Sequence, residues 1–143
     1  MNYRVALVGN PNSGKTTLFN SLTGSNLYVG NWPGVTIEKK EGDLRDTASK
    51  ITLVDLPGIY SLAPYSMDEI VSRDFLLSEP PDLIINILDA SNIERNLYLT
   101  TQLMELKIPI IGVLNMMDIV EKKGLKLDLQ SLKKGFGFPF MEI

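Results

Sequence analysis

One run of residues, Gly9 to Thr16, has the composition and spacing of a phosphate-binding loop, because it follows the pattern G-x-x-x-x-G-K-S/T. The residues before it predict a buried strand over 3–8, and those after it predict a helix over 17–24. A loop between a strand and a helix presents backbone N–H groups and the positive end of the helix dipole to an anion. We therefore expect Lys15 to contact the β- and γ-phosphates of a nucleotide and the Thr16 hydroxyl to bind Mg²⁺.

A second group of residues is typical of a site that holds a terminal phosphate and its metal. Asp55 follows an apolar strand, where its carboxylate would hold Mg²⁺ through water, and the Gly58 N–H would meet the γ-phosphate. Thr36 is the expected second hydroxyl ligand of Mg²⁺, although an ordinary threonine at a strand edge is the alternative. The full set of predicted phosphate-binding residues is Asn10, Pro11, Asn12, Ser13, Gly14, Lys15, Thr16, Thr17 and Gly58.

The motif N-x-x-D, formed by Asn115, Met116 and Asp118, follows another apolar strand and predicts the base of the nucleotide. A carboxylate at Asp118 can accept hydrogen bonds from both N1–H and the 2-amino group of guanine, whereas adenine offers neither donor. Leaving that carboxylate unpaired would disfavour ATP. The sequence therefore predicts GTP and GDP as ligands, with all three residues at the guanine.

Composition narrows the chemistry further. The chain has 143 residues, a net charge of −3, no cysteine and no histidine, which indicates one domain without disulfides, thiolate metal sites or a histidine base. The basic residues are dispersed, so we expect no nucleic-acid partner. The longest apolar runs fall well short of the ~20 residues that cross a bilayer, so we expect a soluble, cytosolic domain.

The order of predicted elements indicates an α/β fold with a doubly wound, mostly parallel, six-stranded sheet and helices on both faces. A stretch with glycine, asparagine and proline but no periodicity, residues 25–36, is expected to be a long functional loop. The predicted strands are 3–8, 37–44, 51–55, 83–88, 108–114 and 138–143. The predicted helices are 17–24, 66–78, 93–107 and one capped by Asp128 that ends at the glycines 135 and 137.

These motifs, taken in order, resemble those of the translation-factor-related small GTPases, which implies a Ras-like P-loop NTPase fold. More closely, residues 29–36, 55–60 and 92–102 resemble the N-terminal G domain of the ferrous iron transport protein B family, and the resemblance covers nearly all 143 residues. It implies that residues 1–143 form a GTP-binding and GTP-hydrolysing domain at the N-terminus of a prokaryotic Fe²⁺ transporter. The switch loops 25–36 and 56–65 would couple or gate iron uptake.

The same resemblance implies which partners the domain has and which elements of the full-length protein would lie outside this sequence. A membrane-embedded iron-permeation domain would follow in the full-length protein, placing this domain at the cytoplasmic face of the cell membrane. The last helix and the fifth guanine motif would lie beyond residue 143, and a homo-oligomer is possible. Two alternatives stay open: a ribosome-assembly GTPase, and a signalling switch in which hydrolysis only resets the state.

Three positions depart from the usual GTPase pattern. Ile59 stands where a glutamine orients water in Ras-like proteins, so we expect a slow intrinsic rate, with the water held near Thr36 and Gly58. Asn12 occupies the position that coordinates K⁺ in similar GTPases, so we expect K⁺ stimulation; the alternative is that Asn12 only stabilises its loop. Met116 replaces a lysine that packs on guanine. The predicted catalytic residues are Lys15, Thr36, Gly58 and Asn12.

Several other residues have a structural and a functional interpretation. Trp32 would cover the ribose or pack when GTP is absent, with neither favoured. Arg73 and Arg95 lie in predicted amphipathic helices, where solvated ion pairs are commoner than arginine fingers. Asp68 and Glu69 are expected at the start of a helix, where acidic side chains complement the dipole.

Overall fold

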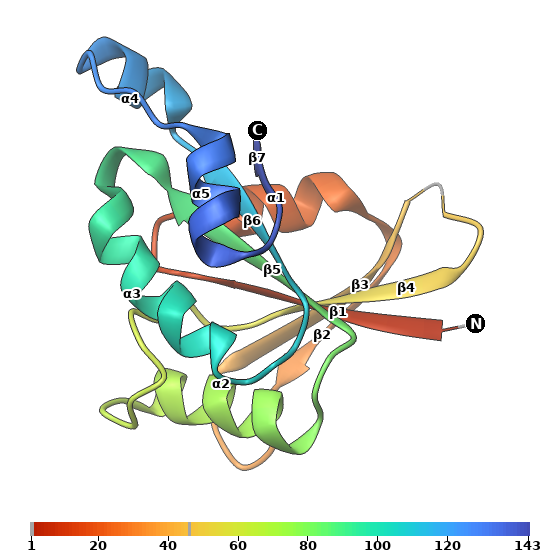
Figure 1. Ribbon diagram of the computed structural model, residues 1–143. Coiled ribbons are helices and arrows are strands. Elements are labelled where there is room, and N and C mark those ends of the chain that lie inside the picture. The colour runs from red at the N-terminus through yellow and green to blue at the C-terminus, as the bar shows by residue number, and fades with distance from the viewer. Residues whose placement is uncertain (1, 46) are drawn as a thin grey trace.

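The computed structural model describes residues 2–45 and 47–143, and it is organised around one twisted sheet (Figure 1). The strand order is β2-β3-β4-β1-β5-β6-β7, with four parallel pairings and two antiparallel ones, β2 with β3 and β3 with β4. The strands are β1 (Asn2–Gly9), β2 (Thr23–Asn31), β3 (Glu38–Leu44), β4 (Lys50–Asp55), β5 (Leu83–Asp89), β6 (Ile110–Asn115) and β7 (Phe140–Glu142).

Helices connect the parallel strands and cover both faces of the sheet. Successive side chains of a strand point to opposite faces, and β1 shows this directly. Val5 and Leu7 pack with Phe19 of α1, whereas Ala6 and Val8 lie in the cluster that includes α2 and α3. The helices are α1 (Lys15–Leu22), α2 (Met67–Ser78), the 3₁₀ turn η1 (Ala90–Asn92), α3 (Ile93–Met104), α4 (Met117–Lys122) and α5 (Leu129–Phe136).

The predicted fold class is confirmed, and three details of the prediction are wrong. The first helix ends at Leu22 rather than at Gly24, because β2 begins at Thr23. The sheet has seven strands rather than six, because β2 (Thr23–Asn31) occupies most of the stretch predicted to be a loop. It pairs with β3 at the edge of the sheet, with Leu27 opposite Gly42 and Asn31 opposite Glu38. The six-residue helix α4 was also not predicted; it begins at Met117, inside the N-x-x-D motif.

Local signals place the ends of the other helices. Ser66 caps α2, its hydroxyl accepting a hydrogen bond from the Glu69 N–H at 3.4 Å. The Asp128 carboxylate caps α5 by accepting from the N–H groups of Gln130 and Ser131, and Gly137 ends that helix with φ 84°. Within the described residues, no helix combines the length and apolar character needed to cross a bilayer.

Candidate nucleotide-binding site

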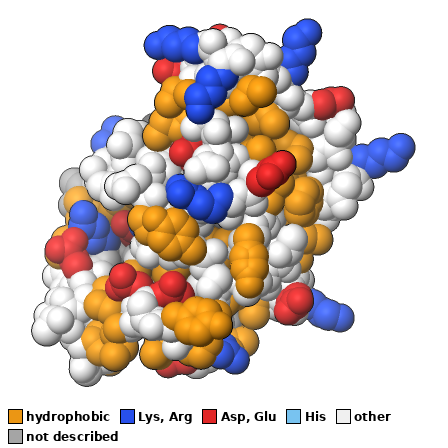
Figure 2. All heavy atoms as spheres, turned by 90° about the vertical axis from the view of Figure 1, so that its left-hand side faces the viewer, with side chains coloured by type: hydrophobic (Ala, Val, Ile, Leu, Met, Phe, Trp, Pro, Cys, Tyr) orange, Lys and Arg blue, Asp and Glu red, His pale blue; other side chains and the backbone are white. Residues whose placement is uncertain are grey.

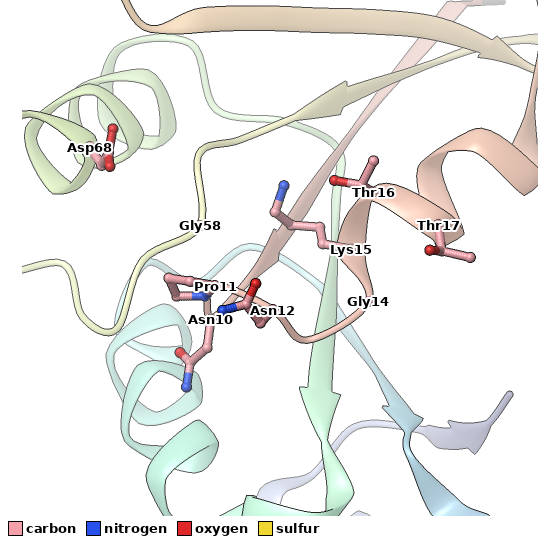
Figure 3. A pocket seen from close by; sticks show the side chains of 9 residues that line it. All are labelled: Asn10, Pro11, Asn12, Gly14, Lys15, Thr16, Thr17, Gly58 and Asp68. Carbon is pink, nitrogen blue, oxygen red and sulfur yellow. The ribbon is translucent and has the colours of Figure 1, made fainter.

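The predicted phosphate loop surrounds a cavity of about 440 Å³ at the carboxyl ends of the parallel strands (Figure 3). Ligands of doubly wound sheets bind at this edge. The lining brings together eight of the nine predicted phosphate-binding residues, Ser13 being the exception, and adds Asp68 of α2. The lining residues are Asn10, Pro11, Asn12, Gly14, Lys15, Thr16, Thr17, Gly58 and Asp68.

The loop is shaped by two residues with positive φ. Gly14 has φ 95° and Asn12 has φ 63°, a backbone region that glycine adopts freely and asparagine more readily than most residues. A Cβ atom on Gly14 would also collide with the side-chain amide of Asn115. Only glycine therefore fits at position 14, which explains why the pattern requires it there.

Ser13 is buried beneath the loop rather than exposed to the cavity. Its side chain is 1% exposed, and its hydroxyl has no hydrogen-bond partner among the described residues. Its backbone carbonyl accepts a hydrogen bond from the Asn115 side-chain amide at 3.1 Å. Ser13 can thus serve a phosphate only through its backbone N–H, which itself donates to the Asn10 carbonyl at 3.3 Å.

The charged centre of the site is an ion pair between the Lys15 ammonium and the Asp55 carboxylate. Their side chains are only 11% and 10% exposed, so both charges are largely removed from water and each neutralises the other. Lys15 begins α1 and Asp55 ends β4, so strand and helix bring them together. A nucleotide phosphate is a competing partner for the ammonium group, and its binding would free Asp55 for a metal.

The residues around Lys15 fit a magnesium ion that also contacts phosphate. Among the described residues, no cluster of three or more His, Cys, Asp or Glu side chains could bind a metal alone. The available donors are the Thr16 hydroxyl and the Asp55 carboxylate, hard oxygen ligands of the type Mg²⁺ prefers. Magnesium here therefore needs phosphate oxygens and water to complete its ligands.

Gly58 lies against the phosphate loop, as the D-x-x-G motif predicts. A Cβ at position 58 would come within 3.0 Å of the Pro11 Cα, so a larger residue would push the two segments apart. The next residue, Ile59, is 1% exposed and belongs to the core, and its N–H donates to the Gly9 carbonyl at 3.0 Å. The Ile59 side chain is thus directed away from the site and cannot orient water.

The structure does not bring Thr36 to this cavity. Thr36 is exposed in the turn between β2 and β3 and is absent from the residues that line the cavity. Trp32, in the same turn, is 5% exposed and packs against Phe75 of α2, so it takes the packed alternative rather than covering a ribose. The expected second magnesium ligand is therefore held elsewhere in this structure.

The predicted guanine residues lie at the end of β6, beside the loop. Asn115 contacts the loop through its hydrogen bond to Ser13, and Met116 turns the chain into α4 with φ 64°. Asp118 is exposed in the first turn of α4, where its carboxylate is open to a ligand. None of the three lines the phosphate cavity.

Other candidate residues take structural positions. Asp68 lies in the first turn of α2, as predicted, yet it also lines the cavity, which sequence reasoning missed (Figure 3). The Arg95 guanidinium lies 5.4 Å from the Tyr60 ring centroid, and Arg73 lines a separate cavity beside Leu62. Neither arginine reaches the phosphate cavity.

The second predicted switch loop, residues 56–65, is buried at Leu56 and Ile59 and exposed at two tyrosines. Leu62 donates its N–H to the Gln102 side chain of α3 at 2.7 Å. The side chains of Tyr60 and Tyr65 are exposed, 47% and 89%. Figure 2, the side on the left of Figure 1, shows apolar side chains interspersed with acidic and basic ones.

The sheet order, the phosphate loop after β1 and the two motifs at the ends of β4 and β6 define a G domain of the P-loop NTPase class. A family model for ferrous iron transport protein B matches residues 3–143. The chain therefore belongs to that family.

Known relatives agree with this assignment. The Fe(2+) transporter FeoB of Escherichia coli K12 is 53% identical over 97% of this chain, and the Salmonella typhimurium FeoB shows the same identity and coverage. The chain spans only 18% of the length of either relative.

Solved structures show the same fold. An S. thermophilus NFeoB variant described as bound to mGDP superposes with a TM-score of 0.95 at 50% identity, covering 100% of this chain and 55% of that one. The cytosolic domain of L. pneumophila FeoB gives 0.92 at 46% identity, covering 98% of this chain and 62% of that one.

Proposed function

We propose that this domain binds GTP and hydrolyses it to GDP and phosphate within a ferrous iron transporter. The proposal rests on the cavity at which the loop 9–16, the Lys15 and Asp55 ion pair and Gly58 meet. Asn115 is hydrogen-bonded to the same loop. Relatives described as bound to GDP or mGDP support a guanine nucleotide as the ligand.

In this proposal the loop amides and Lys15 bind the β- and γ-phosphates, and Gly58 donates its N–H to the γ-phosphate. Mg²⁺ would be held by Thr16 and Asp55, and also by Thr36 once its turn moves. The ion would neutralise part of the negative charge of the phosphates. Asn12 would hold K⁺. An oxygen of water bonds to the γ-phosphorus while the bond to the bridging oxygen breaks, and Ile59 contributes no hydrogen bond to this step.

The base is recognised by Asp118 and Asn115. The Asp118 carboxylate is exposed, and it would accept hydrogen bonds from the N1–H and 2-amino groups of guanine. The absence of a histidine from the sequence and the burial of Ile59 both favour a low intrinsic rate.

The proposed output is control of iron uptake by a membrane-embedded domain of the same full-length protein, with this domain on the cytoplasmic side. The names of the relatives and their much greater length support this over a ribosome-assembly role. A second candidate is a switch in which GTP occupancy gates transport and hydrolysis only resets it, which the buried Ile59 favours.

Calorimetry on the purified domain with Mg²⁺ tests the ligand. We expect GTP and GDP to bind and ATP to bind at least about a hundredfold more weakly, since adenine leaves the Asp118 carboxylate unpaired. Asp118→Asn should remove this preference. Equal affinity for ATP and GTP would contradict the proposal. In the full-length transporter, iron flux with a non-hydrolysable GTP analogue would separate gating by occupancy from gating by hydrolysis.

A further inference from the structure

The turn between β2 and β3 carries a buried aromatic anchor. Trp32 is 5% exposed and meets Phe75 of α2 edge to face, with ring centroids 5.4 Å apart and an interplanar angle of 68°. The Lys39 ammonium lies 4.7 Å from the Trp32 ring centroid. In Figure 1 this turn lies beside α2, at the bottom of the view. Trp32 is thus the aromatic contact between the turn and α2, and the partly buried Val35 and Ile37 of the same turn pack against the same core cluster.

The backbone of the turn is closed by its own hydrogen bonds. The Trp32 N–H donates to the Ile37 carbonyl at 2.9 Å, and the Val35 N–H donates to the Trp32 carbonyl at 3.2 Å. Thr36 lies between these bonded residues, exposed and outside the phosphate cavity. Because the turn is internally bonded and its Val35 and Ile37 pack against the core together with Trp32, the docked turn holds Thr36 in its exposed position.

Two buried polar groups without hydrogen-bond partners destabilise the docked position of the Trp32 ring. The indole Nε1 of Trp32 and the hydroxyl of Ser72 are both buried without a hydrogen-bond partner among the described residues. A cavity of about 240 Å³ beside the ring, lined by Pro33 and Val71 among others, leaves the contact incompletely packed. Burying an indole N–H without an acceptor costs free energy. This cost is removed when the ring leaves Phe75 and water can accept a hydrogen bond from the N–H.

We propose that Trp32 is a positioning residue: docked on Phe75 it holds Thr36 away from the phosphate cavity, and GTP with Mg²⁺ draws the turn off α2. The inference rests on the proposed guanine-nucleotide function, because only a ligand that gains a contact with Thr36 favours the undocked state. GDP lacks the γ-phosphate and leaves the ring docked. Trp32 therefore contributes to the discrimination between GTP and GDP without touching either.

The chain contains one tryptophan, so its emission reports on the ring directly. Emission and acrylamide quenching are measured on the domain with GDP and with a non-hydrolysable GTP analogue, both with Mg²⁺. We expect a protected, blue-shifted signal with GDP and a red-shifted, more strongly quenched signal with the analogue. Unchanged emission in a sample that calorimetry shows to be saturated with the analogue would overturn the inference. Failure of both nucleotides to bind would instead refute the proposed function.

Phe75→Leu tests the contact itself. The substitution removes the contact between the two rings but keeps an apolar side chain at position 75. The affinity for the GTP analogue should therefore rise relative to that for GDP by about twofold to tenfold, which is the change in an equilibrium constant that corresponds to the free energy of one aromatic pair. Phe136→Leu is the matched control, because it breaks a comparable ring contact with Phe140, 5.7 Å away in another part of the fold. An affinity ratio that stays the same in both variants, with only stability lowered, would show that Trp32 is merely structural.

Discussion

The side-chain amide of Asn115 donates a hydrogen bond to the backbone carbonyl of Ser13, with Nδ2 and the oxygen 3.1 Å apart. The two residues are 102 positions apart in the sequence. Through this bond the end of β6 supports the phosphate loop, and Gly14 has no room for a side chain beside it. Asn115 therefore links the part of the site predicted for the base to the part predicted for the phosphates.

Asn115→Ala should weaken GTP and GDP alike, by about tenfold each, because it removes a hydrogen bond that shapes the loop both nucleotides use. Calorimetry with both nucleotides measures the effect. Asn92→Ala, at an exposed asparagine outside the cavity lining, is the control and should leave both affinities unchanged. If Asn115→Ala weakened only one nucleotide, the bond to Ser13 would not be the cause.

The contribution of the Lys15 and Asp55 ion pair to the free energy of unfolding should be measurable in the nucleotide-free protein. Asp55→Ala leaves a largely buried ammonium group unpaired, which should lower the free energy of unfolding by about 3 kcal/mol. The double variant with Lys15→Met should recover most of this loss, since no buried charge remains. Urea unfolding without nucleotide checks both. A double variant as unstable as Asp55→Ala alone would show that the pair is not the source of the loss.

The elements nearest the site were predicted well because their signals are local. The strand predicted over 83–88 is observed as Leu83–Asp89, and the helix predicted over 66–78 is observed as Met67–Ser78. A continuous apolar run specifies a strand buried on both faces, and a capping serine specifies a helix start. The phosphate loop was equally predictable, since its spacing reflects backbone geometry that few sequences satisfy.

What sequence reasoning missed depends on distant contacts. β2 is an edge strand whose exposed Tyr28 and Val29 give no alternating pattern, and it exists because it pairs with β3. Asp68 lines the cavity only because the fold brings the first turn of α2 to face the phosphate loop. Thr36 lies away from the cavity in a turn that packs against α2 through Trp32, a contact that spacing along the chain does not encode.

Ile59→Gln should not convert this domain into a fast GTPase. The side chain of Ile59, a residue of the second switch loop, is buried in the core, so a glutamine amide there has no path to the attacking water. Burying the amide should instead lower the free energy of unfolding by about 1 to 3 kcal/mol. Phosphate release and thermal unfolding measure the two effects. A marked acceleration of hydrolysis would show that the loop turns this side chain outward when GTP binds.

The cap of α5 should give a defined pH dependence. Hydrogen bonds from the Ser131 side chain and from the N–H groups of Ser131 and Gln130 lower the pKa of Asp128 below its ordinary value. A lowered pKa in the folded state means that the cap stabilises above the unfolded pKa, and that this stabilisation is lost as pH falls through the folded pKa. Asp128→Ala should therefore be less stable than the parent at pH 7. The free energies of unfolding of the two proteins, measured in urea, should become equal in acid. A difference that persisted in acid would rule out the charge of Asp128 as its cause.

Asn12 is the residue through which we expect potassium to act. It lines the phosphate cavity with φ 63°, so in the proposed function its amide would lie beside the phosphates of GTP. GTP hydrolysis should be at least about tenfold faster in KCl than in NaCl at equal ionic strength, because a fixed cation there stabilises the charge that develops in the transition state. Asn12→Ala should abolish the difference.

A loss in Asn12→Ala alone would be ambiguous, since alanine strains a backbone with positive φ. Asn12→Gly removes the amide and accepts that backbone without strain, so it separates the two causes. If both variants lose the potassium effect while GDP affinity is retained, the amide is the ligand. If Asn12→Gly keeps the effect, or if the parent hydrolyses GTP equally fast in both salts, Asn12 only stabilises its loop.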